Sequence, residues 1–365
     1  MYKITIIAGA RPNFMKIAPI IHAIQKAKQE NVDIDYRLVH TGQHYDKNMS
    51  GSFFEQLEIP EPHVNLECSG GTQAEQTAAI MISFEKELMA NPSDLVLVVG
   101  DVTSTMACAL VAQKLHTKVA HVEGGIRSDD WSMPEEINRL VTDSITNYFF
   151  TTSETANTNL KQSGVKDEQI FFVGNTMIDT LLKQRPNFTQ PKVWNALGLE
   201  ERNYIVMTLH RPANVDEESQ LKDMIDEIIA NTQDLPLIFP VHPRTAKILE
   251  RLNISHLRLH TVQPLSYLEF NYLVEKAKAV ITDSGGITEE ASIMRVPCLT
   301  LRDNTERPET ISLGTNELIG TNPKNLKPYL ETLFADDWKQ GNDIPLWDGN
   351  TATRIISTIT SVINK

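Results

Sequence analysis

The sequence predicts an α/β protein with two Rossmann-like, doubly wound domains that face a central cleft. Short apolar runs typical of buried strands alternate with helical patterns along most of the chain, which indicates parallel sheets. The length of 365 residues favours two cores over one. Pro186 and Pro191 interrupt the pattern at 184–192 and predict a linker between two such sets.

The expected strands fall into two sets. The first set is predicted at 2–8, 36–40, 95–99, 119–122, 148–151 and 170–173, and the second at 204–209, 237–240, 257–259, 279–282 and 298–301. A helical stripe of apolar residues at 351–363 is expected to pack back on the first domain. The expected domains are therefore residues 1–172 with the terminal helix 351–365, and a nucleotide-binding domain at residues 173–350.

Composition narrows the class of protein. A formal charge of −13 argues against non-specific binding to nucleic acid or to anionic membranes. No apolar stretch reaches the ~20 residues that span a bilayer, and the chain begins directly with a strand, so we expect a cytoplasmic protein. The widely spaced Cys68, Cys108 and Cys298 are expected to be reduced thiols, without the spacing of metal ligands.

The residues that follow each strand matter most, because ligands of doubly wound sheets bind at the carboxyl ends of the strands. After the first strand, Arg11 and Lys16 lie around the start of a helix and could supply fixed cations for a diphosphate. Taken alone, such a pair is more often a solvated helix start.

Carboxylates follow the next strands. Asp101 ends the strand at 95–99, Glu123 ends the following strand, and Glu135 and Glu136 open a helix that carries Arg139. Carboxylates that share a crevice raise one another's pKa, which suits a base for a weakly acidic C–H and its partner acid. Helix capping explains Asp101, Glu135 or Glu136 when each is taken singly. A metal site is a weaker alternative, because no histidine is spaced to join them.

The sequence is organised around a predicted strand, a tight turn and a helix start at 279–294. Ser284, Gly285 and Gly286 form the turn, whose glycines and free helix N–H groups suit a phosphate. Glu290, one turn into the helix, could accept hydrogen bonds from a ribose diol. The plain alternative is a βα corner capped by Ser284.

Cationic and imidazole side chains gather after the strands of the second set: His210, Arg211, His242, Arg244, Arg302 and Arg307. A lone histidine at a strand end is usually structural. Together with the Gly-Gly helix start, these residues predict a basic pocket for a nucleoside diphosphate.

The motifs taken together resemble the non-hydrolysing UDP-N-acetylglucosamine 2-epimerases over nearly the whole chain. The resemblance rests on the segments 9–12 with Lys16, 42–44, 100–101, 121–127, 134–139, 174–176, 210–211, 283–290 and 305–309. It implies a GT-B-like fold, a homodimer, and no metal or cofactor.

The resemblance also implies a reaction and a set of residues. UDP-GlcNAc and UDP-ManNAc would interconvert by loss of UDP to a 2-acetamidoglucal and its re-addition, which would supply ManNAc units for surface polysaccharide. The implied catalytic residues are Asp101, Glu123, Glu135 and His210, with no assignment of base and acid. The implied substrate-binding residues are Arg11, Lys16, Arg139, His242, Ser284, Gly285, Gly286, Glu290 and Arg307.

Some positions depart from the commoner family pattern. Ala10, Asn13 and Pro212 resemble the branch that contains epimerases of UDP-2,3-diacetamido-2,3-dideoxyglucuronate, whereas 305–309 keeps the form of the GlcNAc enzymes. Asp46 stands where many members use a glutamine to bind an activating UDP-GlcNAc. The diacetamido uronate is therefore the first alternative substrate. A GT-B glycosyltransferase, a hydrolysing epimerase and a silent sugar-nucleotide sensor are further alternatives, but the transferase and the sensor would not need three carboxylates.

Overall fold

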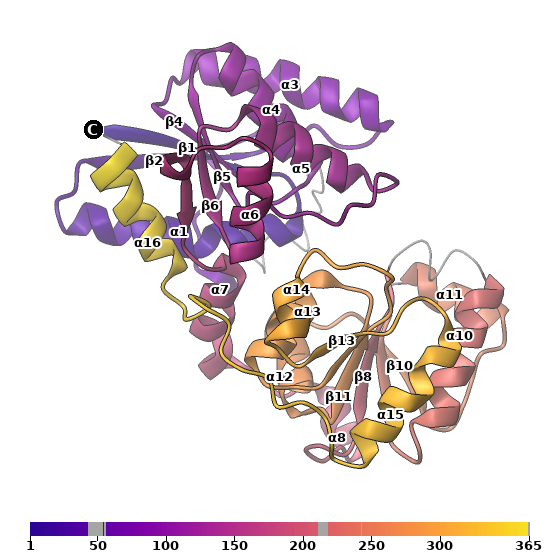
Figure 1. The fold of residues 1–365 in the computed structure, drawn as a ribbon. Coiled ribbons are helices and arrows are strands. Elements are labelled where there is room, and N and C mark those ends of the chain that lie inside the picture. Colours follow the sequence, from indigo (N-terminus) through magenta and orange to yellow (C-terminus); the bar gives the residue numbers. More distant parts are fainter. Residues whose placement is uncertain (43–53, 55, 211–217, 242, 364–365) are drawn as a thin grey trace. The chain divides into compact units, whose positions relative to one another are not determined.

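The fold is taken from a computed structural model, which describes residues 1–42, 54, 56–210, 218–241 and 243–363. The chain divides into two compact units (Figure 1). Unit 1 comprises Met1–Thr180 and Pro345–Lys365, and unit 2 comprises Leu181–Ile344. No helix in the described part of the chain is long and apolar enough to cross a membrane. The three cysteines are free and buried.

Unit 1 contains a parallel sheet with strand order β3-β2-β1-β4-β5-β6-β7. Its strands are β1 (Tyr2–Ala8), β2 (Ile34–His40), β3 (Val64–Asn65), β4 (Leu95–Val99), β5 (Lys118–Val122), β6 (Tyr148–Thr151) and β7 (Ile170–Phe172). The central strand β4 is buried at every position, as its unbroken apolar sequence requires. The strand order reverses between β1 and β4, which makes this pair the place where a doubly wound sheet binds its ligand.

The helices of unit 1 connect these strands. They are α1 (Arg11–Gln29), α3 (Gln73–Ala90), α4 (Thr103–Lys114), α5 (Pro134–Ile145), α6 (Glu154–Gln162) and the 3-10 turn η1 (Asp167–Gln169). The N-terminus of α3 is a capping box, because Thr72 accepts from the backbone of Glu75 and Glu75 accepts from that of Thr72. Ile80, Phe84 and Leu88 of α3 pack into the core beside β4.

Unit 2 repeats the architecture with strand order β10-β9-β8-β11-β12-β13, again parallel. The strands are β8 (Ile205–Thr208), β9 (Leu237–Pro240), β10 (Leu259–Val262), β11 (Ala279–Thr282), β12 (Cys298–Thr300) and β13 (Asn316–Leu318). The helices are η2 (Arg185–Asn187), α8 (Lys192–Leu197), α10 (Glu218–Asn231), α11 (Pro243–Arg251), α12 (Tyr267–Lys276), α13 (Gly285–Ile293), α14 (Pro308–Ser312), η3 (Pro323–Asn325) and α15 (Leu326–Phe334). The strand order reverses here between β8 and β11.

The C-terminal segment completes unit 1. Helix α16 (Thr351–Thr358), followed by the turn η4 (Ile359–Ile363), packs against α1. The carboxylate of Asp179 in α7 (Thr176–Gln184) accepts from the backbone N–H groups of Thr351 (3.1 Å) and Ala352 (2.7 Å). The buried indole of Trp347 donates to the carbonyl of Thr152 (2.9 Å). These bonds explain why the terminal helix belongs to unit 1.

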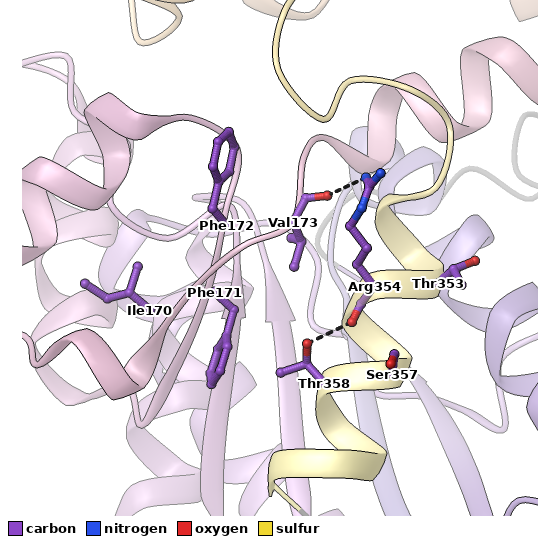
Figure 2. Close-up of a pocket in the computed structure, with 8 residues that line it drawn as sticks. All are labelled: Ile170, Phe171, Phe172, Val173, Thr353, Arg354, Ser357 and Thr358. Atoms are coloured by element: carbon purple, nitrogen blue, oxygen red, sulfur yellow. Dashed lines mark hydrogen bonds between the residues drawn. The ribbon is translucent and has the colours of Figure 1, made fainter.

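A groove of about 600 Å³ lies between the edge strand β7 and α16 (Figure 2). The guanidinium of Arg354 donates to the carbonyl of Val173 (3.0 Å) across it, and also pairs with Asp348. Arg354 therefore holds α16 at the edge of the sheet.

The unit boundary and one strand differ from the sequence-based expectation. The boundary falls after Thr180 rather than after residue 172, because Thr180 donates to the carbonyl of Met15 (2.6 Å) and Asp179 binds the start of α16. The strand expected at 257–259 runs over Leu259–Val262, and Leu257 is 90% exposed. The short strands β3 and β13 were not predicted.

Candidate functional site

The candidate residues of unit 1 gather at the switch point between β1 and β4. The ammonium of Lys16, on α1, lies 2.8 Å from Oε2 of Glu123, which follows β5 and is 3% exposed. Gly100, after β4, has φ +68°, and a Cβ there would lie 3.2 Å from the Lys16 nitrogen. Glycine at this position therefore leaves room for Lys16 to reach Glu123.

Asp101 is held by α5. The Arg139 guanidinium donates to Oδ2 of Asp101 through Nε (3.1 Å) and Nη2 (2.9 Å), and Asn138 donates to the Asp101 carbonyl (2.9 Å). The Asp101 side chain remains 33% exposed, whereas Arg139 is buried. Asp101 is thus fixed in position and open to solvent, as a group that exchanges protons with a ligand must be.

Glu135 and Glu136 have different environments. Glu136 is buried, pairs with Arg139, and accepts from the backbone N–H (3.0 Å) and hydroxyl (3.0 Å) of Ser128. Glu135 is partly exposed, and its carboxylate has no hydrogen bond to any described residue. It shares a helix face with Asn138 and Arg139, three and four positions on, which are bound to Asp101. Glu136 is therefore held by contacts within unit 1, whereas the carboxylate of Glu135 is accessible to solvent.

Capping does not account for these carboxylates. The N-cap of α4 is Val102 and that of α5 is Met133, and neither helix has a side-chain cap. The negatively charged Glu135 and Glu136 do lie in the first turn of α5, where the helix dipole favours them.

The turn after β5 rests on a buried polar network. Glu123 has φ +70°, an uncommon backbone conformation for a residue with a side chain, and Gly125 follows with φ +82°. The carboxylate of Asp143, on α5, accepts from the backbone of Gly125 (3.0 Å) and from Arg127 (2.6 Å), and it contacts His121. Burial raises the pKa of Asp143, but the hydrogen bonds and charges of His121 and Arg127 outweigh burial and leave that pKa below its ordinary value.

In unit 2, the turn after β11 meets the end of β8. The buried carboxylate of Asp283 accepts from the backbone N–H of His210 through both oxygens (3.1 and 3.0 Å). Ser284 is the N-cap residue of α13, but its side chain makes no capping bond. Gly285 and Gly286 form the first turn of α13, so the helix N-terminus presents free backbone N–H groups at the switch point of this sheet.

Glu290 lies on the buried side of α13. Its Oε1 accepts from the hydroxyl of Tyr267 (2.8 Å), and the residue is 4% exposed. Burial, with a further contribution from neighbouring Glu289, raises the pKa of Glu290 to about 7. Burial of Tyr267 itself and the charge of Glu290 raise the pKa of Tyr267 well above its usual value. Glu290 is thus a carboxyl that changes charge near neutral pH.

Two of the predicted basic side chains of unit 2 are paired with carboxylates. Arg307 is buried and pairs with Glu289, and Arg302 donates to both oxygens of Glu306 (2.7 and 2.9 Å). Each of these guanidinium groups is therefore partly neutralised by a carboxylate. The sequence reasoning missed both pairings, although Arg302 and Glu306 stand at i and i+4.

Four predicted residues lie outside this description in whole or in part. Arg211 and His242 are not among the described residues, and only the backbones of Arg11, the first residue of α1, and of Arg244 in α11 belong to them. Among the described residues, no group of three or more His, Cys, Asp or Glu side chains could hold a metal ion.

Comparison with known proteins identifies the family. The family model for UDP-N-acetylglucosamine 2-epimerase matches residues 25–360. A UDP-N-acetylglucosamine 2-epimerase from Methanocaldococcus jannaschii is 41% identical over 371 residues, covering 98% of this chain and 99% of that protein. A UDP-2,3-diacetamido-2,3-dideoxy-D-glucuronate 2-epimerase from Pseudomonas aeruginosa is 40% identical over 324 residues, covering 87% of this chain and 88% of that protein.

A solved structure supports the same assignment. The UDP-GlcNAc 2-epimerase from Methanocaldococcus jannaschii in complex with UDP-GlcNAc and UDP is 41% identical and superposes with a TM-score of 0.87, covering 98% of this chain and 99% of that one. Sequence and fold agree over nearly the full length of both proteins. The chain therefore belongs to the UDP-N-acetylglucosamine 2-epimerase family and is an isomerase.

Proposed function

We propose that this protein interconverts UDP-GlcNAc and UDP-ManNAc by eliminating UDP to a 2-acetamidoglucal and adding it back. The observation that carries the proposal is the 41% identity, over nearly the whole chain, to a relative named for this activity and solved with UDP-GlcNAc and UDP. The carboxylates at the switch point of unit 1 and the open helix start of unit 2 are consistent with it.

In this proposal, unit 2 binds the nucleotide. The backbone N–H groups of Gly285 and Gly286 and the side chain of Ser284 would bind the diphosphate, and Glu290 would accept hydrogen bonds from the ribose. His210, at the end of β8, would contact the reacting part of the substrate. Arg307, with Glu289 as its partner, would stabilise the charge on the departing diphosphate.

Unit 1 would act on the sugar. The proton on sugar carbon 2 is weakly acidic, so its removal needs a well-placed carboxylate, and return of a proton on the other face needs a second acid. Asp101, Glu123 and Glu135 would supply these groups. Lys16, beside Glu123, and Arg139, beside Asp101, would hold these two side chains in place.

Proton NMR of the protein with UDP-GlcNAc in heavy water, without added metal or NAD, tests this reaction. UDP-ManNAc should appear and deuterium should enter at carbon 2. Release of free ManNAc with UDP would instead identify a hydrolysing enzyme. Absence of exchange would contradict the proposed substrate.

Single substitutions test the carboxylates. Asp101→Asn, Glu123→Gln and Glu135→Gln should each lower the exchange rate by about 10²–10⁴-fold, the usual contribution of a positioned acid or base. Glu30→Gln, at an exposed carboxylate after α1, is the matched control and should exchange at the wild-type rate. Wild-type exchange in all three site variants would remove these carboxylates from the mechanism.

A second substrate has specific support. The relative from Pseudomonas aeruginosa named for UDP-2,3-diacetamido-2,3-dideoxy-D-glucuronate is 40% identical, nearly as similar as the first. The two substrates should be compared by kcat/KM under the same conditions. A higher value for the diacetamido uronate would reassign the substrate and leave the reaction class intact.

The family also suggests how the protein works in the cell. We propose a cytoplasmic homodimer that supplies ManNAc units for surface polysaccharide. Ile82 and Met89, two turns apart on α3, expose apolar side chains that could contribute to an interface between copies. Light scattering should give twice the 41.0 kDa mass of one chain; the mass of one chain would contradict the dimer.

A further inference from the structure

His121, the penultimate residue of β5, lies between the turns that carry two candidate catalytic carboxylates. Its imidazole is 0% exposed. Nε2 lies 2.8 Å from the carbonyl oxygen of Gly100, the residue before Asp101, and Nδ1 lies 2.7 Å from Oδ1 of Asp143. Glu123 follows His121 by two residues. One side chain therefore joins the end of β4, the end of β5 and helix α5.

The partners of His121 decide its protonation state. A backbone carbonyl only accepts hydrogen bonds, so Nε2 must carry a hydrogen. Asp143 also accepts: its Oδ2 receives the N–H of Gly125 (3.0 Å) and the Arg127 guanidinium (2.6 Å), and its pKa lies below its ordinary value, which favours the carboxylate. Nδ1 must then carry a hydrogen as well. A neutral imidazole has a single N–H, so this arrangement requires the imidazolium form.

The charges around the ring fit a cation. Asp143 of α5 supplies the negative charge in direct contact, and Arg127 shares that carboxylate from the loop after β5. Lys16 of α1 pairs with Glu123, which lies on the turn after β5. The cation is therefore paired within its own hydrogen-bond network, and a buried charge is stable only with such pairing.

The turns that His121 joins have little freedom to move. Gly100, at φ +68°, donates to the carbonyl of Val122 (3.0 Å), which links it to β5. A Cβ on Gly124 would lie 2.9 Å from the Phe149 ring and 3.4 Å from Nδ1 of His121. The imidazole of His121 and the ring of Phe149 therefore leave no room for a side chain on Gly124.

We propose that His121 is a positioning residue that donates from both ring nitrogens, fixes Asp101 through the Gly100 carbonyl and supports the turn that carries Glu123. This inference rests on the proposed function only for the roles of Asp101 and Glu123. The protonation state and the tether to Gly100 stand on the geometry of unit 1 alone.

Nitrogen NMR of protein labelled with ¹⁵N-histidine tests the protonation state. Both ring nitrogens of His121 should show the signature of N–H in the folded protein. The resonances are assigned by their loss in the His121→Gln variant. One unprotonated nitrogen in the wild type would overturn the proposal, whatever the substrate of the enzyme.

Asp143→Asn gives a second, independent readout. The side-chain carbonyl of asparagine must face the two donors Gly125 and Arg127, which turns its NH₂ group toward His121. Nδ1 must then accept, so His121 should become neutral with its hydrogen on Nε2. A doubly protonated ring in this variant would show that Asp143 does not set the charge.

A pair of substitutions tests separately the two hydrogen bonds that His121 makes, one to Gly100 and one to Asp143. The amide nitrogen of glutamine overlays Nε2 and can keep the bond to Gly100, whereas that of asparagine overlays Nδ1 and can keep only the bond to Asp143. His121→Asn should lower kcat by about 100-fold, the cost of misplacing a reacting group by about 1 Å, with KM nearly unchanged. His121→Gln should retain most of kcat.

The controls keep this test independent of folding and of the proposed substrate. His116→Gln, at an exposed histidine after α4, should match the wild type. Equal losses of kcat in His121→Asn and His121→Gln would overturn the role of the Gly100 tether. If the wild-type protein does not turn over UDP-GlcNAc, the proposed function fails, while the NMR result still decides the protonation of His121.

Discussion

Glu290→Gln tests whether burial in unit 2 makes the stability of the protein depend on the charge of a carboxyl group. The pKa of Glu290 is raised from 4.5 to about 7, chiefly by burial, so the folded protein binds this proton more tightly than the unfolded chain. The two values differ by about 2.5, and each pKa unit corresponds to about 1.4 kcal/mol, which gives about 3 kcal/mol.

The sign of the effect follows from the raised pKa. The stability that the neutral carboxyl provides is complete below pH 4.5 and is lost as the pH rises through about 7. Glutamine stays neutral and can still accept from Tyr267. Between pH 5 and pH 8.5, the wild type should therefore lose about 2–3 kcal/mol of unfolding free energy relative to Glu290→Gln.

Urea unfolding at several pH values measures this difference. Trp194 and Trp338 belong to the same unit as Glu290, so tryptophan fluorescence reports on its unfolding. Glu250→Gln, at an exposed carboxylate of α11, is the control and should show no pH-dependent difference. A difference between wild type and Glu290→Gln that stays constant with pH would refute the reasoning.

Two further predictions concern the stability of the folded units, each with a matched control. Arg139→Met should destabilise unit 1 by about 3–5 kcal/mol, because it leaves buried Glu136 without its cation; Arg185→Met, which removes a largely exposed pair, should cost about 1 kcal/mol or less in urea unfolding. Gly125→Ala should destabilise the protein clearly more than Gly164→Ala. Both sites have positive φ, which costs about 1–2 kcal/mol for alanine. Of the two sites, only Gly125 would place a Cβ against a carbonyl oxygen, that of Ala156, at 2.4 Å. Equal thermal stability of the two alanine variants would contradict the steric argument.

The sequence by itself was sufficient for the fold class and for the location of the principal strands. The apolar runs at Leu95–Val99 and Ala279–Thr282 became strands with the predicted bounds, because a strand buried on both faces needs an unbroken apolar sequence. It failed where that signal is weak. The strand near Leu257 was displaced, and the short strands Val64–Asn65 and Asn316–Leu318 were missed, since two or three residues carry no readable periodicity.

The sequence also supplied the candidate chemistry, because it grouped polar residues after strands that a parallel sheet brings to one edge. The residue types alone did not separate Glu135 from Glu136, and only the family resemblance favoured Glu135. That choice depends on which side chain points toward Ser128 and Arg139, a property of helix rotation and packing.

Only the tertiary structure decided which charges meet. The pairing of His121 with Asp143 joins residues 22 apart in the chain, and that of Arg307 with Glu289 joins a loop to a helix. Local propensity is a property of neighbouring residues, whereas the energy of a buried charge depends on whatever the fold brings within about 3–4 Å of it. The sequence therefore determined which groups are available to the site, and the packing of the two sheets with their helices determined which of them are paired and which are left to act.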